Sequence, residues 1–261
     1  MDENLKNEPL VSIMMTTYNR ADYTRLAILS ILAQSYQNWE LLVLDDCSSD
    51  NTGEMVAGYS TNDARIKYLP APENLGITKN RNRGFEFANG KYIAILDCDD
   101  IWTDPEKLKA QVTFLESNPE YVVVGTGVDI INHVGDKIGS LRYFTEDTDI
   151  RRKILGRNQF THSATLIRAD ALPSRRPYDE SGAVSIWEDY DLFLRLGLNG
   201  KLANLPENMT AYRVHDSNIS KEHRRSGALA HLDIIKRYNE HYPGYYLALL
   251  KGYLRLVLAW I

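Results

Sequence analysis

Three acidic side chains lie within four residues of one another at the end of an apolar run. Residues 91–96 are nearly all apolar or aromatic, as expected of a strand buried on both faces, and they lead into Asp97, Asp99 and Asp100. Carboxylates this close repel one another strongly unless a cation lies among them. Open α/β sheets bind ligands just beyond the carboxyl ends of their strands. The spacing therefore predicts a site for a divalent metal and a phosphate group.

Two further polar loops follow apolar runs, at residues 11–15 and 40–44. These loops are residues 16–20 and residues 45–48. Each loop alone has a common turn composition, so a structural role is the simpler interpretation of either one. The carboxyl ends of parallel strands meet at one edge of a sheet, which would bring all three loops together. Three such loops at one edge favour a nucleotide-binding site.

The elements that must position these loops alternate between strands and helices. Leu26, Leu29 and Leu32 recur at helical spacing after the first loop, and residues 66–69 form a further short strand. A second helix is expected near residues 78–88, before the strand that leads to the acidic cluster. This βαβαβ order predicts an α/β fold with a mostly parallel sheet and helices on both faces.

Composition narrows the class of protein. The chain has 261 residues and a formal net charge of −5, whereas nucleic-acid binders usually carry a basic surplus. Cys47 and Cys98 lack the spacing of metal ligands, and a reduced, cytoplasmic setting is the simpler interpretation. The N-terminus shows no signal peptide, and no stretch approaches the roughly 20 apolar residues of a spanning helix.

The ordered motifs at residues 11–20, 44–50, 74–82 and 90–100 resemble those of family 2 glycosyltransferases, of the spore-coat glycosyltransferase type. The resemblance continues through residues 187–191 and 212–215, so it covers residues 9 to 220. It implies the GT-A fold, a Rossmann-like, mostly parallel central sheet flanked by helices. It also implies a nucleotide-sugar donor, most often UDP-linked, and a divalent metal, Mn²⁺ or Mg²⁺.

The resemblance assigns roles in the donor site. Thr16 and Tyr18 match positions that hold the nucleobase and ribose, and Asp46 matches a carboxylate that accepts a hydrogen bond from the base. Asp97 and Asp99 form the DxD signature of the family. The metal ligand is Asp99 or Asp100, because the bend of the turn decides between them, and His215 is a further candidate. The other expected donor contacts are Asn19, Arg20, Asn74 and Arg81, although Arg81 fits an exposed helix face equally well.

The second half is expected to carry the chemistry. Residues 187–191 resemble a Glu-Asp element of the family in which the Asp is the catalytic base. We expect Asp189 to be the base, Glu188 to position the acceptor, and Asp191 to be the alternative base. An inverting transfer needs such a carboxylate to take the proton of the acceptor hydroxyl. The alternative is structural, because acids in the first turn of a helix stabilise its dipole.

The last 17 residues, 245–261, are strongly apolar and carry two charges, Lys251 and Arg255. They are expected to form a helical tail that packs on the core, forms a dimer helix, or lies at a membrane interface. We expect a catalytic domain over residues 1–220, with a nucleotide-binding half at 9–104 and an acceptor-binding half at 105–220. A helical extension would follow at 221–261.

The resemblance implies an inverting, metal-dependent glycosyltransferase. It would move a hexosyl or N-acetylhexosaminyl group from a UDP-sugar to a saccharide or lipid-linked acceptor in cell-surface polysaccharide synthesis. The enzyme would be cytoplasmic, at the inner face of the membrane if its tail is interfacial. A sugar-1-phosphate nucleotidyltransferase would carry a Gly-rich Arg/Lys loop after the first strand, where this chain has residues 16–19. A non-catalytic nucleotide-sugar-binding protein is the remaining alternative.

Overall fold

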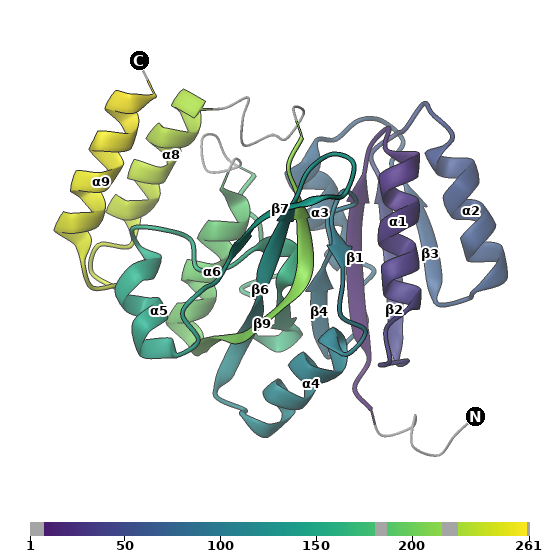
Figure 1. Ribbon diagram of the computed structural model, residues 1–261, viewed down its shortest axis with the longest axis horizontal. Helices are drawn as coiled ribbons and strands as arrows, with labels where there is room; N and C mark the ends of the chain where they lie inside the picture. Colours follow the sequence, from purple (N-terminus) through teal and green to yellow (C-terminus); the bar gives the residue numbers. More distant parts are fainter. Residues whose placement is uncertain (1–7, 181–186, 216–223, 260–261) are drawn as a thin grey trace.

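The structure is a computed structural model that describes residues 8–180, 187–215 and 224–259 (Figure 1). The first half contains β1 (Val11–Thr17), α1 (Ala21–Leu32), β2 (Trp39–Asp45), α2 (Thr52–Asn62), β3 (Ile66–Pro70), α3 (Ile77–Phe85), β4 (Tyr92–Ile95) and β5 (Ile101–Trp102). The second half contains α4 (Lys107–Ser117), β6 (Tyr121–Ile131), β7 (Lys137–Leu141), α5 (Asp147–Ile154), β8 (Leu166–Arg168), α6 (Glu188–Asn199) and β9 (Lys201–Arg213). The helices α8 (Arg224–Arg237) and α9 (Tyr245–Leu258) follow.

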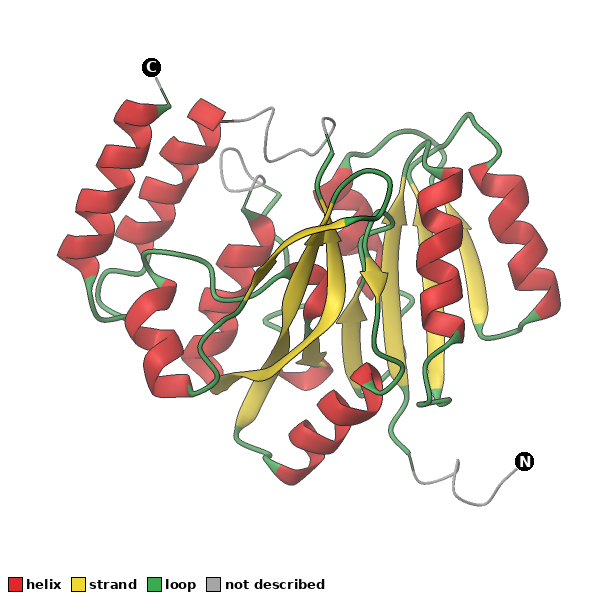
Figure 2. Cartoon of the chain, viewed as in Figure 1, coloured by secondary structure: helices red, strands yellow, loops and turns green. Residues whose placement is uncertain are grey.

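The strands of the described residues join one sheet, drawn in yellow in Figure 2. Their order is β3-β2-β1-β4-β8-β6-β9-β5, with β7 paired to β6. The pairs β3-β2, β2-β1 and β1-β4 are parallel, as the βαβαβ order predicts. The short strand β8 then pairs antiparallel to both β4 and β6, which joins the two halves of the chain in one sheet. The α/β fold class with a central sheet and a C-terminal helical tail is confirmed. The sheet is mixed, however, and not mostly parallel, because the pairs β4-β8, β8-β6, β6-β7 and β9-β5 are antiparallel.

Alternating strand residues build an apolar core on each face of the sheet. Ile13 and Leu41 point to the side covered by α1, α2 and α4, while Met14 and Leu42 point to the side covered by α3, α5, α6 and α8. Side chains on adjacent strand positions face opposite sides, so a strand that is apolar at every position can serve both cores. This double burial fixes the carboxyl ends of β1, β2 and β4 at one edge.

β9 is a long strand that the sequence pattern does not show as a whole. β9 begins at Lys201 and pairs parallel with β6, with register shifts near Gly127. The polar segment from Pro206 to Asn208 hides this strand in the sequence, because it breaks the apolar pattern. A Cβ at Gly127 would lie 2.2 Å from the Asn208 side-chain oxygen, so the irregular pairing needs glycine there.

The helices α8 and α9 pack against each other at the outer edge of the molecule (Figure 1). The buried face of α9 is narrow and includes Ala248 and Gly252. None of the described helices is both long enough and apolar enough to cross a bilayer.

Gly90 allows the backbone before β4 to approach β1. A Cβ at this position would lie 2.5 Å from the Ser12 backbone nitrogen and 2.7 Å from the Tyr92 carbonyl oxygen. We expect Gly90→Ala to lower the free energy of unfolding by about 1–3 kcal/mol in urea denaturation, because backbone atoms must move. The control is Gly58→Ala in α2, which meets no atom within 4 Å. Gly58→Ala should raise the free energy of unfolding by about 0.5–1 kcal/mol. Equal effects of the two substitutions would contradict a requirement for glycine at position 90.

Candidate functional site

A cleft of about 1000 Å³ opens at the carboxyl ends of β1, β2 and β4. Its floor and one wall come from the loops that follow these strands. The opposite wall comes from the second half of the chain, from Tyr143 to Asp189, and its mouth is bordered by α8 and α9 through residues such as Ala228 and Leu258. The predicted convergence of the three polar loops is therefore found in the structure.

Asn19 holds two of these loops together. Its side-chain oxygen accepts hydrogen bonds from the backbone N–H groups of Ser49, at 2.7 Å, and Asp50, at 3.3 Å. Asn19 adopts the left-handed conformation with φ 51°, which asparagine tolerates better than most residues. Asn19 does not line the cleft. Its position between the loops supports Tyr18 and Arg20, which do.

Asp46 organises the loop that precedes α3. Its two carboxylate oxygens accept hydrogen bonds from the backbone N–H groups of Leu75, at 2.8 Å, and Gly76, at 3.0 Å. Asn74 donates to the Asp46 carbonyl oxygen at 3.3 Å, and both side chains border the cleft. Gly76 has φ 81°, a conformation that glycine adopts without strain. The carboxylate thus anchors the glycine loop at the entrance to α3.

Arg81 forms the central contact of the site. It lies in α3, is 5% exposed, and donates hydrogen bonds to both Asp97 at the end of β4 and Glu188 at the start of α6. The exposed-helix interpretation of Arg81 is therefore wrong. Its Nε atom is buried without a hydrogen-bond partner in the structure. The guanidinium joins the first and second halves of the chain across the cleft.

The charge of Arg81 sets the ionisation of its two partners. Burial by itself would raise the pKa of Asp97, but the adjacent guanidinium outweighs burial and holds that pKa below its ordinary value. Burial raises the pKa of Glu188, and there Arg81 offsets the shift only in part. Burial and the Arg81 charge lower the pKa of His162, another cleft residue, to about 3. His162 is therefore neutral at physiological pH.

Asp99 and Asp100 lie in a tight turn after β4, where the Asp100 N–H donates to the Asp97 carbonyl oxygen at 3.0 Å. Because the chain bends here, all three aspartates line the cleft. Asp99 accepts a hydrogen bond from His215 at 2.9 Å, and Asp100 accepts one from the Arg213 N–H at 2.8 Å. Burial, followed by the neighbouring carboxylates, raises the pKa of both Asp99 and Asp100.

His215 itself does not line the cleft. It stacks on Tyr23 of α1, with ring centroids 5.7 Å apart, and approaches the cleft through its contact with Asp99. Among the described residues, no group of three or more His, Cys, Asp or Glu side chains is arranged to hold a metal ion.

Asp189 faces the cleft from the first turn of α6. Asn158 donates to its carboxylate at 3.3 Å, and burial together with the nearby Glu188 charge raises the pKa of Asp189 to about 7. A carboxylate with this pKa is well matched to proton transfer near neutral pH.

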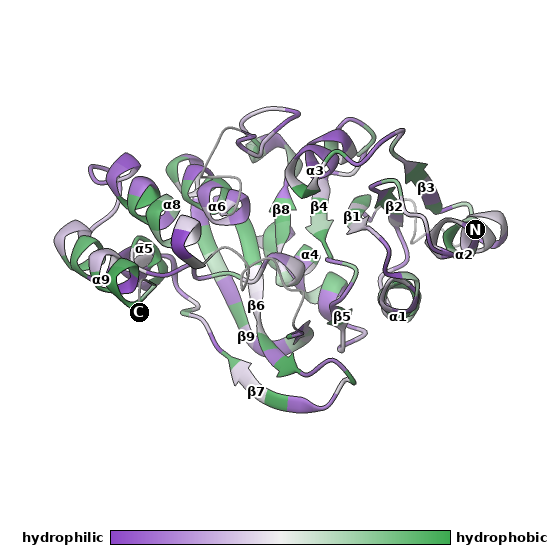
Figure 3. Ribbon diagram, turned by 90° about the horizontal axis from the view of Figure 1, so that it is seen from above, coloured by the Kyte–Doolittle hydropathy of each residue, from purple (hydrophilic) through white to green (hydrophobic). Residues whose placement is uncertain are grey.

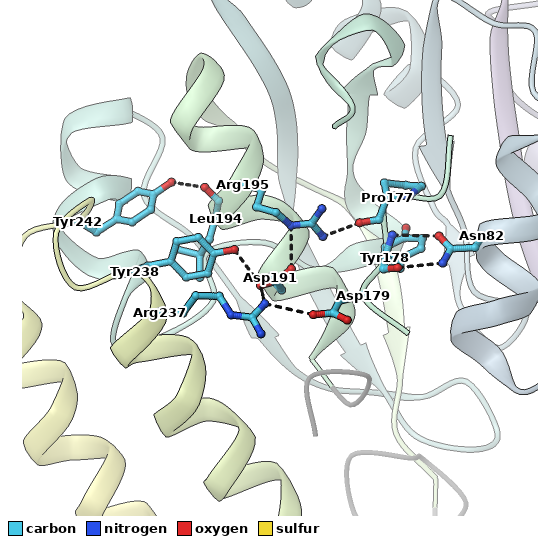
Figure 4. Close-up of polar contacts among 10 residues, drawn as sticks. All are labelled: Asn82, Pro177, Tyr178, Asp179, Asp191, Leu194, Arg195, Arg237, Tyr238 and Tyr242. Atoms are coloured by element: carbon cyan, nitrogen blue, oxygen red, sulfur yellow. Dashed lines mark hydrogen bonds and ion pairs between the residues drawn. The ribbon is translucent and has the colours of Figure 1, made fainter. Parts of the chain in front are cut away.

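Asp191 does not line the cleft. Two residues further along the helix than Asp189, its side chain points to a different side and is fully buried. It accepts hydrogen bonds from Arg195 at 2.8 Å, Arg237 at 3.1 Å and Tyr238 at 2.8 Å (Figure 4). These contacts tie α6 to α8, so Asp191 has a structural position and is not a candidate base.

Most of the predicted site residues meet at the cleft. Those that line it are Thr16, Tyr18, Arg20, Asp46, Asn74, Arg81, Asp97, Asp99, Asp100, Glu188 and Asp189. Asn19, Asp191 and His215 do not. Sequence reasoning missed the wall formed by Tyr143, Arg255 and Ala259, because no local pattern indicates that residues so far apart face the same cleft.

The fold is that of GT-A glycosyltransferases. The structure of TarS from S. aureus in complex with UDP-GlcNAc matches with a TM-score of 0.72 at 19% identity, over 94% of this chain and 72% of that chain. The mannosyltransferase PcManGT from Pyrobaculum calidifontis, in complex with GDP-Man and Mn²⁺, matches with a TM-score of 0.69 at 15% identity. The latter match covers 98% of this chain and 76% of that chain.

The chain belongs to glycosyl transferase family 2, whose family model matches residues 12–182. The putative glycosyltransferase EpsE of Bacillus subtilis is 32% identical over 222 residues, which cover 84% of this chain and 78% of that protein. WfgD of Escherichia coli, a UDP-Glc:alpha-D-GlcNAc-diphosphoundecaprenol beta-1,3-glucosyltransferase, is 43% identical over 124 residues. That alignment covers 48% of this chain and 47% of WfgD.

The Arg81 contacts predict a large, pH-dependent effect on stability. Arg81→Gln should lower the free energy of unfolding by about 3–5 kcal/mol near neutral pH, because it leaves the buried Glu188 and the partly buried Asp97 without a counter-charge. Arg81 lowers the pKa of Asp97 in the folded state, so this stabilisation is present above the ordinary pKa of an aspartate and is lost as the pH falls. Urea denaturation at neutral and at acidic pH measures both effects.

The matched control is Arg176→Gln, which breaks an exposed ion pair with Glu86. That pair should contribute less than about 1 kcal/mol. The Arg81 bridge would be contradicted if both variants lost a similar free energy of unfolding. It would also be contradicted if the effect of Arg81→Gln were as large at acidic pH as at neutral pH.

Proposed function

We propose that this chain is an inverting, metal-dependent glycosyltransferase. It moves a hexosyl or N-acetylhexosaminyl group from a UDP-sugar to a saccharide or lipid-linked saccharide during cell-surface polysaccharide synthesis. The observation that carries the proposal is the Arg81 bridge, which joins Asp97 of the donor side to Glu188 of the acceptor side. Asp189 lies next to this bridge in the same cleft, so a donor and an acceptor can meet at a carboxylate.

The donor side of the cleft has the groups that a nucleotide needs. Tyr18 is 48% exposed at the cleft, and its ring offers a surface for a nucleobase. Each carboxylate oxygen has two lone pairs, so Asp46 can accept the N3–H of uracil in addition to the loop amides. A UDP donor is supported by the names of WfgD and of the TarS complex, whereas PcManGT was solved with GDP-Man.

Asp99 and Asp100 would hold the metal. Mg²⁺ is usually bound through one or two carboxylates together with waters and substrate phosphates, and hard oxygen ligands also suit Mn²⁺. Asp99 is the better candidate for the metal ligand, because its side chain is 24% exposed. Asp100 is 1% exposed, and its carboxylate already accepts a hydrogen bond from the Arg213 N–H. His215 then orients Asp99 through their hydrogen bond. A bound metal would neutralise the charge that develops on the departing diphosphate.

Asp189 would act as the base. Its carboxylate takes the proton of the acceptor hydroxyl while that oxygen forms a bond to the anomeric carbon of the sugar. The bond from this carbon to the phosphate oxygen breaks on the opposite face, and UDP leaves. Glu188 cannot readily take this role, because its carboxylate is held by Arg81 and is 5% exposed. It positions the start of α6 and the acceptor instead.

A lipid-linked acceptor would place the reaction at the inner face of the cytoplasmic membrane. The acceptor named for WfgD is a sugar on diphosphoundecaprenol, which supports this choice. Both cysteines are unpaired, in keeping with a reduced, cytoplasmic setting.

We propose a division into a catalytic domain at 1–220, with halves at 9–104 and 105–220, and an extension at 221–261. A non-catalytic binder differs in one observable, because it would not release UDP from a donor in the presence of Mn²⁺.

Removal of the metal ligand should weaken donor binding. We expect Asp99→Asn to reduce UDP affinity in Mn²⁺ by at least about ten-fold, or about 1.4 kcal/mol, to the value measured in EDTA. Isothermal calorimetry with and without Mn²⁺ measures this, and Asp100→Asn in parallel tests the second carboxylate. Asp136→Asn, on an exposed turn, is the control. If Asp99→Asn retains the Mn²⁺ dependence of the wild type, the metal assignment fails.

Substitution of the base should separate transfer from binding. Asp189→Asn is expected to lower turnover about 10²–10⁴-fold while UDP affinity is unchanged. In the wild type, transfer should fall about ten-fold per unit as the pH drops below the Asp189 pKa of about 7, because the ionised form is the base. UDP release from a panel of UDP-sugars, with Mn²⁺ and an acceptor, measures both effects.

The same raised pKa predicts that the stability contribution of Asp189 decreases with pH, whereas the transfer activity increases with pH. Because the folded-state pKa of Asp189 is raised, its stability contribution is present in acid and is lost as the pH rises through about 7. Asp189→Asn should therefore raise the Tm in alkaline buffer. Asp191→Asn is the matched control, since it should lower the Tm and leave the pH profile of transfer intact. Near-normal turnover of Asp189→Asn would rule out its role as base.

A further inference from the structure

The outer face of α9 is a continuous apolar surface. It consists of side chains that are between 47% and 83% exposed, here called the apolar stripe: Tyr246, Leu247, Leu250, Tyr253, Leu254, Val257 and Leu258. These seven are among the sixteen exposed large apolar side chains of the described residues, so they are concentrated on one helix. Single exposed apolar residues are ordinary, whereas a contiguous patch of this kind marks an interaction surface.

A basic concavity lies beside the apolar stripe, between α5 and α9. This second pocket has a volume of about 230 Å³. The cations that line it, here called the cationic pocket, are Arg142, Arg152, Lys153, Arg157 and Lys251. No Asp or Glu is among its lining residues, although the chain as a whole has a net charge of −5. The two surfaces meet at Leu247, which belongs to the stripe and also lines the pocket.

Most of these cations are available to a ligand. Within the described part of the chain, the side chains of Arg142, Lys153, Arg157 and Lys251 have no hydrogen-bond or ion-pair partner. Arg152 has a weak, exposed contact with Asp149 at 3.3 Å. The first turn of α9, from Gly244, borders the same pocket, and the positive end of its helix dipole adds to the field. The concavity is therefore suited to an anionic group such as a phosphate.

The apolar stripe also reaches the mouth of the catalytic cleft. Arg255 and Leu258, near the end of α9, line that cleft together with Ala259. The helix thus extends from the cationic pocket at its first turn to the cleft at its last, along the outer edge of the molecule (Figure 1, Figure 3). The 14 residues of α9 include Lys251 and Arg255 but no acid.

We propose that α9 and the cationic pocket form a membrane-docking face. The apolar stripe enters the interfacial layer of an anionic leaflet, and the cationic pocket holds the phosphate of a lipid headgroup. An apolar helix face with flanking cations is the general form of such surfaces. A second copy of the chain fits less well, because the cationic pockets of two copies would repel each other. Docking in this way would hold the cleft mouth at the bilayer. Its use in delivering a lipid-linked acceptor rests on the proposed function, whereas the docking itself does not.

Vesicle flotation of the intact chain tests the apolar stripe. Vesicles of phosphatidylcholine with phosphatidylglycerol should capture the protein, and phosphatidylcholine alone should capture much less. Leu250→Glu with Leu254→Glu should lower the partition coefficient at least about ten-fold, because two leucines leave the lipid. The matched control is Val134→Glu with Ile138→Glu, at positions that are 67% and 60% exposed, against 67% and 58% for the leucines. The control should bind as the wild type does.

Charge substitutions test the cationic pocket. Lys153→Gln with Arg157→Gln should weaken binding to the anionic vesicles about 25-fold, at about five-fold per cation. Lys91→Gln with Lys109→Gln removes the same charge from exposed positions away from α9 and should have little effect. Inorganic phosphate at physiological concentration should not displace the protein, which distinguishes a headgroup in a bilayer from free phosphate as the ligand.

Three results would overturn the proposal. Wild-type protein that is not captured by anionic vesicles would exclude docking. Equal capture of the wild type and the stripe variant would assign binding to another surface. A dimer in sedimentation velocity that the stripe variant dissociates, without vesicle binding, would assign the stripe to a second copy. Calorimetry with UDP on the same preparations separates the membrane-docking proposal from the proposed function. Vesicle binding without UDP binding would contradict the proposed function and leave the docking proposal intact.

Discussion

The buried contact of Arg81 with Asp97 and Glu188 is the constraint on which the site depends. A guanidinium that is 5% exposed is tolerable only if carboxylates stay beside it, and either carboxylate alone would be costly to bury. The three residues come from α3, the end of β4 and the start of α6. Their mutual need for a counter-charge therefore fixes the first half of the chain against the second half across the cleft. The two apolar cores hold the elements in place, and this contact sets the geometry where they meet.

The same charges shift the pKa values of the acids of the cleft in different directions. Arg81 keeps Asp97 ionised, while burial and neighbouring carboxylates raise the pKa of Asp99, Asp100 and Asp189. Groups whose environments separate their pKa values can take different chemical roles in one site. A cation among the aspartates would relieve the repulsion that the sequence already indicates, and Asp189 stands apart from it with a pKa suited to a base.

The C-terminal helices connect the cleft with the surface of the molecule. Asp191 binds Arg237 and Tyr238 of α8, so the helix that presents Asp189 to the cleft is also fixed to the helical tail. α9 packs on α8 through small residues such as Gly252, where a Cβ would lie 2.6 Å from Leu232. This close approach leaves the larger apolar side chains of α9 on the outside. A surface that would bind lipid and a carboxylate that would activate the acceptor are thus linked through one helix pair.

Local patterns in the sequence determined the four strands β1 to β4, the helices α1 and α3, and the meeting of three polar loops, because a βαβαβ order leaves little freedom in a parallel sheet. They also indicated the family and most of the charged residues that line the cleft. The tertiary structure decided what depends on distant partners. Arg81 and Glu188 are 107 residues apart, so no periodicity could show that Arg81 is buried. The helix phase that turns Asp189 toward the cleft and Asp191 away from it, and the arrival of α9 at the cleft mouth, likewise depend on packing. Sequence patterns report the periodicity of one element, whereas a site depends on how separate elements share the cost of burying their charges.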